Sequence, residues 1–329
     1  MARSLQLSFM SMALPPNRAL EKIHAGEVVR VYVTGNFASP RHVDFVGRSG
    51  VFDAIWFDLE HFDIPTQDLA TLCLVARAHP VTTIARLKAT DYQVVMRTLE
   101  TGVGGLMCSM VADAEEARRI VSWAKFNNPK PIAGEITGQR GWNGGNIDSG
   151  YAAYPAIDYM RHQNTQTMIL CQIENEQALA EAAAIAAVPG VDGLFFGPGD
   201  YSVSIGVPGQ IGHPAVQGAI ERVAEAARQA GKFWGTVAVG QELYERAVKL
   251  GAKFLCPGGD LKVMTLGLRE LAKTFDVATG TPGAAVAPAK PRYPDPAALT
   301  GSRKCAPRAD VPPSGFPSPC RNLKLFTRT

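Results

Sequence analysis

The sequence lacks several features that would place it in special classes of protein. No apolar run approaches the roughly 18 residues of a membrane-spanning helix, so no membrane partner is expected. The cysteines contain no C-x-x-C pair, and four of the six sit in apolar runs, where a free cysteine behaves as a small hydrophobic residue (Cys73, Cys108, Cys171, Cys256, Cys305, Cys320). Reduced thiols in a cytoplasmic protein are expected, rather than a disulfide framework.

The main body of the chain, residues 1–276, also lacks a strong excess of positive or negative charge. The formal net charge is +3, but from Val277 onward eight basic residues stand against two acidic ones. The part before Val277 is therefore slightly acidic, which argues against nucleic acid as a partner. The first residues are weakly apolar, but Ser and Gln interrupt them, so a signal peptide is not predicted.

Composition divides the 329 residues into three parts. Residues 1–20 form an N-terminal extension, and residues 21–276 carry regular alternating patterns. Residues 277–329 contain ten of the 23 prolines and little apolar periodicity, which is typical of a disordered tail.

The pattern within 21–276 predicts an α/β fold. Eight strand-like apolar runs alternate with amphipathic segments (strands Val29–Thr34, Ala54–Asp58, Thr82–Leu87, Gly105–Met110, Met168–Ile173, Gly193–Phe196, Phe233–Val239 and Phe254–Pro257; helices Asp91–Thr101, Asp113–Phe126, Glu176–Ala187, Ala215–Ala230, Gln241–Leu250 and Leu261–Phe275). This is the count of a (β/α)8 TIM barrel. A doubly wound open sheet remains an alternative, although the first strand is followed by a single glycine, Gly35, and not by a glycine-rich phosphate loop.

A long connection, residues 127–166, interrupts the alternation. It contains the glycine-rich run 138–145, together with Trp142 and several tyrosines. Connections of this length are usually functional or disordered. The aromatic residues favour an ordered flap.

Charged residues follow four of the predicted strands where each ends. Asp58, Glu60 and His61 end the second strand, Arg86 lies at the end of the third, Glu174 follows the fifth, and Asp200 follows the sixth after Gly197-Pro198-Gly199. In parallel α/β folds, active sites lie at the carboxyl ends of the strands. Barrel closure would bring these side chains to one pocket.

The residue types suggest chemistry on a 2-oxo acid. Glu174 and Asp200 offer oxygen ligands suited to Mg2+ or Mn2+. Arg86 would stabilise charge on an enolate oxygen, and His61, oriented by Asp58 or Glu60, would act as a general base. At Gly199 the absent side chain would let backbone N–H groups approach a substrate carboxylate.

Each residue also has a purely structural explanation. Glu174 would be an acid at a helix N-terminus, and Gly-Pro-Gly-Asp a turn. Asp58 and Glu60 would pair with Arg86, and Arg140 in the long connection would be either a solvated charge or a substrate contact. Their joint occurrence at four strand ends favours a site.

The motifs resemble those of the HpcH/HpaI aldolase family, also called the 2,4-dihydroxyhept-2-ene-1,7-dioate aldolase and citrate lyase beta family, in the phosphoenolpyruvate/pyruvate barrel superfamily. The resemblance covers roughly residues 20–275 and is carried by FDLEH, IARL, DAEEAR, QRG, QIEN and GVDGLFFGPGDYSVSIG (57–61, 84–87, 113–118, 139–141, 172–175 and 190–206). The sequence departs from the family pattern at Leu59, at Phe62-Asp63 and at Tyr201, which alter the pocket walls.

The resemblance implies a class II aldolase, a carbon–carbon lyase that reversibly cleaves 4-hydroxy-2-oxo acids to pyruvate and an aldehyde through a metal-bound pyruvate enolate. It implies a divalent cation (Mg2+, Mn2+ or Co2+) as cofactor and a role in 2-oxo acid metabolism, including aromatic catabolism. The implied roles are metal ligation (Glu174, Asp200), enolate stabilisation (Arg86), an acid/base dyad (His61, Asp58) and substrate binding (Gly199, Asp200, Arg86, Gln172), with Glu60 and Arg140 as further candidates. It also implies a homohexamer in which helix Leu261–Phe275 is exchanged between subunits.

Two other functions remain open. One is an acyl-CoA lyase of the malyl or citramalyl type in the same superfamily, although the body shows no clear basic cluster for the nucleotide of CoA. The other is a non-catalytic barrel that binds a small carboxylate. Metal-dependent pyruvate release, thioester turnover, and binding without turnover would distinguish the three.

Overall fold

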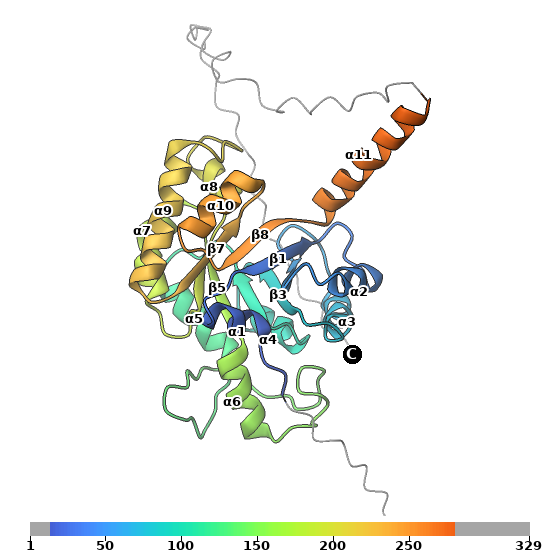
Figure 1. Ribbon diagram of the computed structural model, residues 1–329. Coiled ribbons are helices and arrows are strands. Elements are labelled where there is room, and N and C mark those ends of the chain that lie inside the picture. Colours follow the sequence, from blue (N-terminus) through green and yellow to red (C-terminus); the bar gives the residue numbers. More distant parts are fainter. Residues whose placement is uncertain (1–13, 280–329) are drawn as a thin grey trace, which may run out of the picture. The chain divides into compact units, whose positions relative to one another are not determined.

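Eight parallel strands close into a barrel in the computed structural model, which describes residues 14–279 (Figure 1). Each strand pairs with the next, and the last pairs with the first (β1 Val29–Thr34, β2 Ala54–Asp58, β3 Thr82–Leu87, β4 Gly105–Cys108, β5 Met168–Ile173, β6 Gly193–Phe196, β7 Phe233–Val237, β8 Phe254–Gly259). The predicted (β/α)8 barrel is confirmed, and the open-sheet alternative is excluded by closure between β8 and β1. The predicted tail and the first 13 residues lie outside the described residues.

Helix α1 precedes β1, helices α2 to α10 connect the strands, and α11 follows β8 (α1 Arg18–His24, α2 Pro40–Arg48, α3 Thr66–Ala76, α4 Tyr92–Glu100, α5 Ala114–Ala124, α6 Ala156–Gln166, α7 Glu176–Ala186, α8 Pro198–Ser204, α9 Pro214–Gln229, α10 Gln241–Lys249, α11 Asp260–Thr279). The six predicted helices are present, and α11 is longer than predicted. Five helices were not predicted: α1, α2, α3, α6 and α8. Two of these, α1 and α8, have seven residues each, too few to show a helical period. The chain divides into two units after Leu271, and the described part of the second is the end of α11.

Local sequence explains where several helices begin and end. The Asp113 carboxylate accepts the Glu116 N–H at the start of α5, and Asn175 caps α7 in the same way through the Ala178 N–H. Gly102, Gly231 and Gly251 follow the ends of α4, α9 and α10 with φ of +86°, +67° and +83°. These are the left-handed conformations that favour glycine after a helix.

The interior of the barrel is filled by alternate residues of the strands. Inward-facing side chains form one apolar cluster that includes Trp56, Ile84, Leu170 and Phe195, and the rings of Trp56 and Phe195 meet edge to face at 5.5 Å. Helix α1 contributes Ala19, Leu20 and Ile23 to the same cluster and so closes the amino end of the barrel. Only the carboxyl end is left for chemistry.

The connection between β4 and β5 is ordered, as predicted, but it is not a structureless flap. It contains helix α6 and a bridge between Phe126 and Arg140. Its end is fixed near the amino ends of the strands, because Asn17, the N-cap of α1, donates from its side chain both to Gln166 O at 2.8 Å and to Gly104 O at 3.0 Å.

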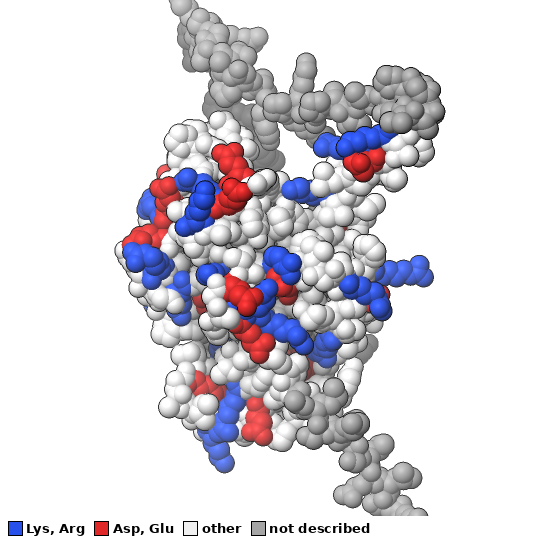
Figure 2. Space-filling view, in the orientation of Figure 1, with Lys and Arg blue, Asp and Glu red and all other residues white. Residues whose placement is uncertain are grey.

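The distribution of surface charge and the state of the cysteines agree with what the composition predicts for the described residues. Lys and Arg side chains intermingle with Asp and Glu on the face shown in Figure 2. The four cysteines within the described residues are buried and free, as predicted. Among helices in residues 14–279, none is long and apolar enough to cross a membrane.

Close strand packing makes one glycine a sensitive probe of the barrel. A Cβ at Gly105 on β4 would lie 2.6 Å from Met168 O and 2.8 Å from Met168 Cβ. We expect Gly105→Ala to lower the free energy of unfolding by about 1–3 kcal/mol through overpacking. Gly218→Ala in α9, where a Cβ would meet nothing within 4 Å, should instead raise it by roughly 0.5–1 kcal/mol. Urea denaturation at one fixed protomer concentration measures both; an unchanged midpoint for Gly105→Ala would contradict the packing.

Candidate active site

Strand alternation continues from the apolar interior into a polar layer at the carboxyl end of the barrel. Asp58 lies two residues after Trp56 on β2, and Arg86 lies two residues after Ile84 on β3, so each polar residue faces the same side as the apolar one before it. On β5, Leu170 is followed by Gln172 and then by Glu174 just past the strand. All four polar side chains are at least nine-tenths buried (Asp58, Arg86, Gln172, Glu174). The structure therefore brings together predicted site residues from three strands.

A buried ion pair joins two neighbouring strands. Asp58 and Arg86 are register partners in the β2–β3 ladder. Arg86 Nε donates to Asp58 Oδ1 at 2.9 Å, and a terminal nitrogen donates to Oδ2 at 2.5 Å, a bidentate arrangement. Removing one partner of such a buried pair typically costs about 3–5 kcal/mol, because the other charge is left uncompensated.

The same guanidinium touches two further groups. Its Nε lies 3.4 Å from Glu60 Oε2, and its Cζ lies 4.7 Å from the centre of the Trp56 ring. Glu60 Oε2 has no hydrogen-bond partner although it is buried. Arg86 is thus hydrogen-bonded by Asp58, lies over the Trp56 ring and has the charge of Glu60 nearby.

Glu174 is held by donors on both oxygens. Met110 N donates to Oε1 at 2.5 Å, and the Gln172 side-chain amide donates to Oε2. Met110 follows β4 and has φ of +53°, a left-handed conformation that is strained for any residue but glycine. Gln172 Oε1 is buried without a partner.

The environment of Glu174 disfavours its charged form. The pKa of this carboxyl is raised to about 7, mainly by burial; the Met110 N–H and Arg86 lower it, and the nearby charges of Glu60 and Asp200 contribute to the rise. Burial and nearby negative charges both destabilise the charged form of this carboxyl group. Carboxyl groups in such surroundings are typical of sites that bind a cation or exchange a proton.

Asp200 reaches the same rim from β6. It lies in the first turn of α8 and is exposed, as is Gly199 beside it. The predicted turn Gly-Pro-Gly-Asp is therefore the start of a short helix. Gly197 must lack a side chain, because a Cβ there would lie 2.8 Å from Gln172 Nε2 and 2.9 Å from Glu174 Oε2.

His61 lies at the rim with an exposed side chain. The contact between Asp58 and His61 runs through the His61 backbone N–H, 3.4 Å from Asp58 Oδ1, while both carboxylate oxygens bind Arg86. A side-chain contact between Asp58 and the His61 ring, as a dyad requires, stays a prediction. Asp58 also accepts the Glu60 N–H at 3.1 Å and so shapes the loop that carries the imidazole.

Arg140 is engaged elsewhere. It is 2% exposed, donates to Asp148 Oδ2 at 2.9 Å and stacks over Phe126 at 4.2 Å. Tyr159 donates to the same Asp148 oxygen. Within the described chain, Arg140 therefore organises the β4–β5 connection, and the reading of it as a solvated charge is wrong.

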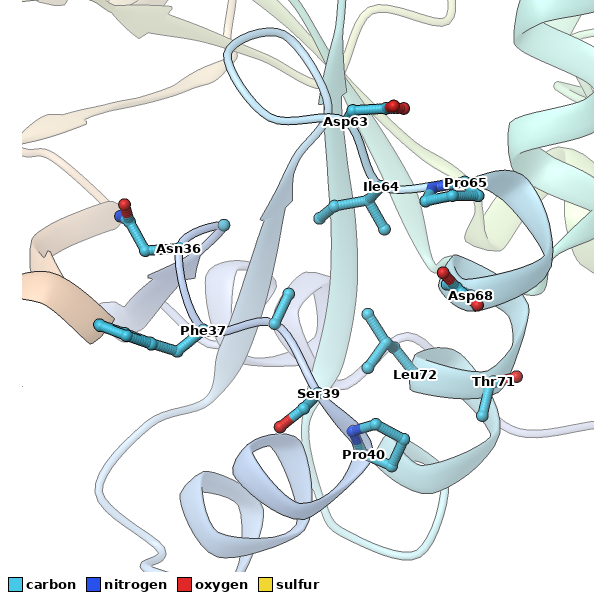
Figure 3. Close-up of a pocket in the computed structure, with 12 residues that line it drawn as sticks. Asn36, Phe37, Ser39, Pro40, Asp63, Ile64, Pro65, Asp68, Thr71 and Leu72 are labelled. Atoms are coloured by element: carbon cyan, nitrogen blue, oxygen red, sulfur yellow. The ribbon is translucent and has the colours of Figure 1, made fainter.

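A cavity of about 590 Å3 lies beside the site and does not contain its acids (Figure 3). It is lined by the loop after β1, the loop after β2 and the start of α3, and Ile64 and Leu72 point into it. Phe62 packs against Gly35 at its edge, where a Gly35 Cβ would lie 2.2 Å from the ring. The departure from the family pattern at Phe62 thus fills space between the first two loops.

The donor set fits a hard divalent cation. Mg2+ and Mn2+ take oxygen ligands and retain open positions for water or substrate. Glu174 and Asp200 supply carboxylate oxygens, Glu60 adds negative charge nearby, and Gln172 Oε1 is buried without a hydrogen-bond partner. Between residues 14 and 279, no group of three His, Cys, Asp or Glu side chains is placed to hold a metal ion by itself.

Three residues of the site were missed by sequence reasoning. The Met110 backbone has no residue-type signal, since a non-glycine residue rarely adopts positive φ. Gly197 was named only as part of a turn. Trp56 could have been found, because strand alternation places it on the same face as Asp58.

Fold and site define a class: a (β/α)8 barrel with a carboxylate-rich, arginine-containing centre at the carboxyl ends of β2, β3, β5 and β6. The model of the HpcH/HpaI aldolase/citrate lyase family matches residues 31–265. The chain belongs to this family, and it is an enzyme of the lyase kind.

Named relatives are similar over most of their length. The hydroxypyruvate/pyruvate aldolase of Pseudomonas aeruginosa is 30% identical over 83% of this chain and 98% of its own. The 4-hydroxy-2-oxo-heptane-1,7-dioate aldolase of Salmonella paratyphi C is 31% identical over 71% of this chain and 85% of its own. The solved structure of an HpcH/HpaI aldolase from Desulfitobacterium hafniense superposes with a TM-score of 0.72 at 29% identity, over 78% of this chain and 96% of that one.

The raised pKa of Glu174 predicts a pH-dependent stability in the metal-free protein. Between the ordinary pKa of 4.5 and about 7 the folded state holds a proton that the unfolded state has lost, so stability falls as pH rises through this window. Glu174→Gln removes the titration. We expect the variant to gain stability over wild type between pH 5 and pH 8, by up to roughly 3 kcal/mol.

Urea unfolding of both proteins in EDTA at a series of pH values measures this gain. A stability difference that stays constant from pH 5 to pH 8 would show that Glu174 is not destabilised when charged. Glu115→Gln, on the exposed side of α5, serves as the matched control and should show no such trend.

Proposed function

We propose that this chain is a divalent-metal-dependent pyruvate aldolase that reversibly cleaves 4-hydroxy-2-oxo acids to pyruvate and an aldehyde. The observation that carries the proposal is the Glu174 carboxyl, buried and with its pKa raised to about 7, among the charges of Glu60, Asp200 and Arg86. Two of the similar proteins are named as aldolases of pyruvate or of a 4-hydroxy-2-oxo acid, which supports the same chemistry here.

Glu174 and Asp200 would hold the cation. When bound, the cation would act as a Lewis acid that polarises the keto group of the 2-oxo acid. Met110 N–H and the Gln172 amide hold the Glu174 carboxylate by hydrogen bonds and would fix its orientation when a cation is bound.

Arg86 would stabilise the enolate. The pair with Asp58 uses Nε and one terminal nitrogen, which leaves the other terminal nitrogen for a substrate oxygen. Because the guanidinium is fixed by Asp58 and by the Trp56 face, it meets developing negative charge without reorganisation.

His61 would move the proton. In cleavage, the imidazole accepts the proton of the C4 hydroxyl, the C3–C4 bond breaks, and its electron pair forms the enolate while the aldehyde leaves. Protonation at C3 then gives pyruvate. The N–H groups at Gly199 and Asp200 would bind the substrate carboxylate, where an exposed glycine leaves the backbone open.

The test is pyruvate release from 4-hydroxy-2-oxo acids of graded chain length, with EDTA and after addition of Mg2+, Mn2+ or Co2+. Release that the metal restores, and that Glu174→Ala abolishes, is the expected result. Release that survives EDTA would overturn the metal requirement. Turnover of malyl- or citramalyl-CoA alone, or saturable binding of pyruvate without turnover, would replace the proposal with one of the two other functions.

We expect His61→Ala to lose aldol cleavage activity while it keeps oxaloacetate decarboxylation activity. Aldol cleavage needs an acceptor for the hydroxyl proton and should fall by about 10²–10⁴-fold. Decarboxylation of oxaloacetate needs no such acceptor and should be largely retained. His24→Ala, an exposed histidine at the end of α1, should change neither rate. Equal losses in both reactions of His61→Ala would contradict the base role.

We further propose a homo-oligomer built on α11. Six apolar side chains of this helix are 46–63% exposed (Leu261, Val263, Met264, Leu266, Leu268, Leu271). Monomeric proteins rarely leave such a continuous apolar surface in water. Phe45 on α2 and Val248 on α10, the helices beside β1 and β8, are also exposed and offer a surface for the helix of a second copy.

Charge placed on α11 should dissociate the oligomer. Met264→Glu combined with Leu268→Glu, one turn apart on the same face of α11, would bury two carboxylates in the interface, and sedimentation velocity should show a smaller species than wild type. Val51→Glu, at an exposed apolar residue before β2, is the control and should keep the wild-type mass. An unchanged mass for the α11 variant would contradict the interface.

A further inference from the structure

Lys88 is a charged residue near the site to which the proposed chemistry gives no role. It follows β3, two residues after Arg86. Its Nζ donates to Met110 O at 2.7 Å and to Glu116 Oε1 at 2.5 Å. The lysine therefore ties the end of β3 to the turn after β4 and to α5.

The Met110 peptide is the link to the site. Its N–H donates to Glu174 Oε1 at 2.5 Å, while its carbonyl oxygen accepts from Lys88. Met110 has φ of +53°, so its backbone is in a strained conformation that the surroundings must maintain. Its side chain is 45% exposed and gives the turn little packing.

Glu116 fixes the other end of this arrangement. Its Oε2 accepts the Ala112 N–H at 2.8 Å, and its own N–H is capped by Asp113 at 2.8 Å. The side chain of Glu116 is only 14% exposed. Lys88 and Glu116 together hold the turn at Met110 and at Ala112, on both sides of Val111.

We propose that Lys88 is a positioning residue for the metal site: it holds the strained Met110 peptide so that its N–H orients the Glu174 carboxylate. The inference rests on the proposed function, because Glu174 is there a metal ligand. Groups that orient metal ligands in this way typically change affinity by about 10–100-fold when they are removed.

Electrostatics alone predicts the opposite sign. Removing a lysine near the site takes away a positive charge that repels a cation, so metal binding would tighten. Removing a positioning contact lets the Met110 turn relax and weakens binding. The direction of the change therefore separates a positioning role from a mere charge.

The experiment titrates Mn2+ into the metal-free protein by calorimetry, with no substrate present. Lys88→Met, which keeps the side-chain length, should weaken Mn2+ binding by about tenfold or more. Lys88→Arg should retain most of the affinity. Arg119→Met, which removes a cation from the exposed side of α5, should leave it unchanged.

A double-mutant cycle keeps the test independent of folding defects. Glycine tolerates positive φ, so a Met110→Gly background needs less restraint from Lys88. We expect Lys88→Met to cost less affinity there than in wild type, and Glu116→Gln to weaken binding in the same direction as Lys88→Met. An equal cost in both backgrounds would overturn the inference.

The outcomes distinguish this inference from the proposed function. If wild type binds Mn2+ and Glu174→Ala does not, but Lys88→Met binds as tightly as wild type or more tightly, the positioning role fails and the function stands. If wild type binds no Mn2+, or if Glu174→Ala binds like wild type, both fail together.

Discussion

The ion pair between Asp58 and Arg86 is the constraint around which the site is arranged. It lies across two neighbouring strands in register, more than nine-tenths buried, with the guanidinium against Trp56. Because two charges in such a position are stable only when paired, the pair fixes the orientation of Arg86 and the loop that carries Glu60 and His61. Neither carboxylate oxygen of Asp58 is left free of Arg86.

A second set of contacts does the same for Glu174 at the end of β5, two strands from Arg86. Glu174 would be costly as a buried anion, and two donors, Met110 N–H and Gln172, compensate it only in part. The charged form of this one carboxyl group therefore destabilises the folded protein, as is common where a site is built from groups that disfavour the folded state.

Much of the fold was predictable because strands and helices produce recognisable patterns among neighbouring residues. Apolar runs of four to seven residues predicted all eight strands, and the helices predicted at Asp113–Phe126 and Glu176–Ala187 are confirmed, with Asp113 and Asn175 as their N-caps. Short helices such as α8 were missed because seven residues span barely two turns. Arg140 was open to two interpretations because nothing in its neighbourhood of sequence reveals the partner Asp148 on the folded connection.

The sequence alone determined which residue types stand at the ends of the strands, since alternation and the change from apolar to charged are properties of neighbouring residues. Tertiary structure decided what those residues touch. Asp58 accepts two hydrogen bonds from Arg86 on the neighbouring strand, and Glu174 accepts the backbone N–H of Met110, 64 residues away. These contacts depend on barrel closure, on the register between strands and on a backbone conformation that residue type does not reveal, and none of the three is a local property of the chain.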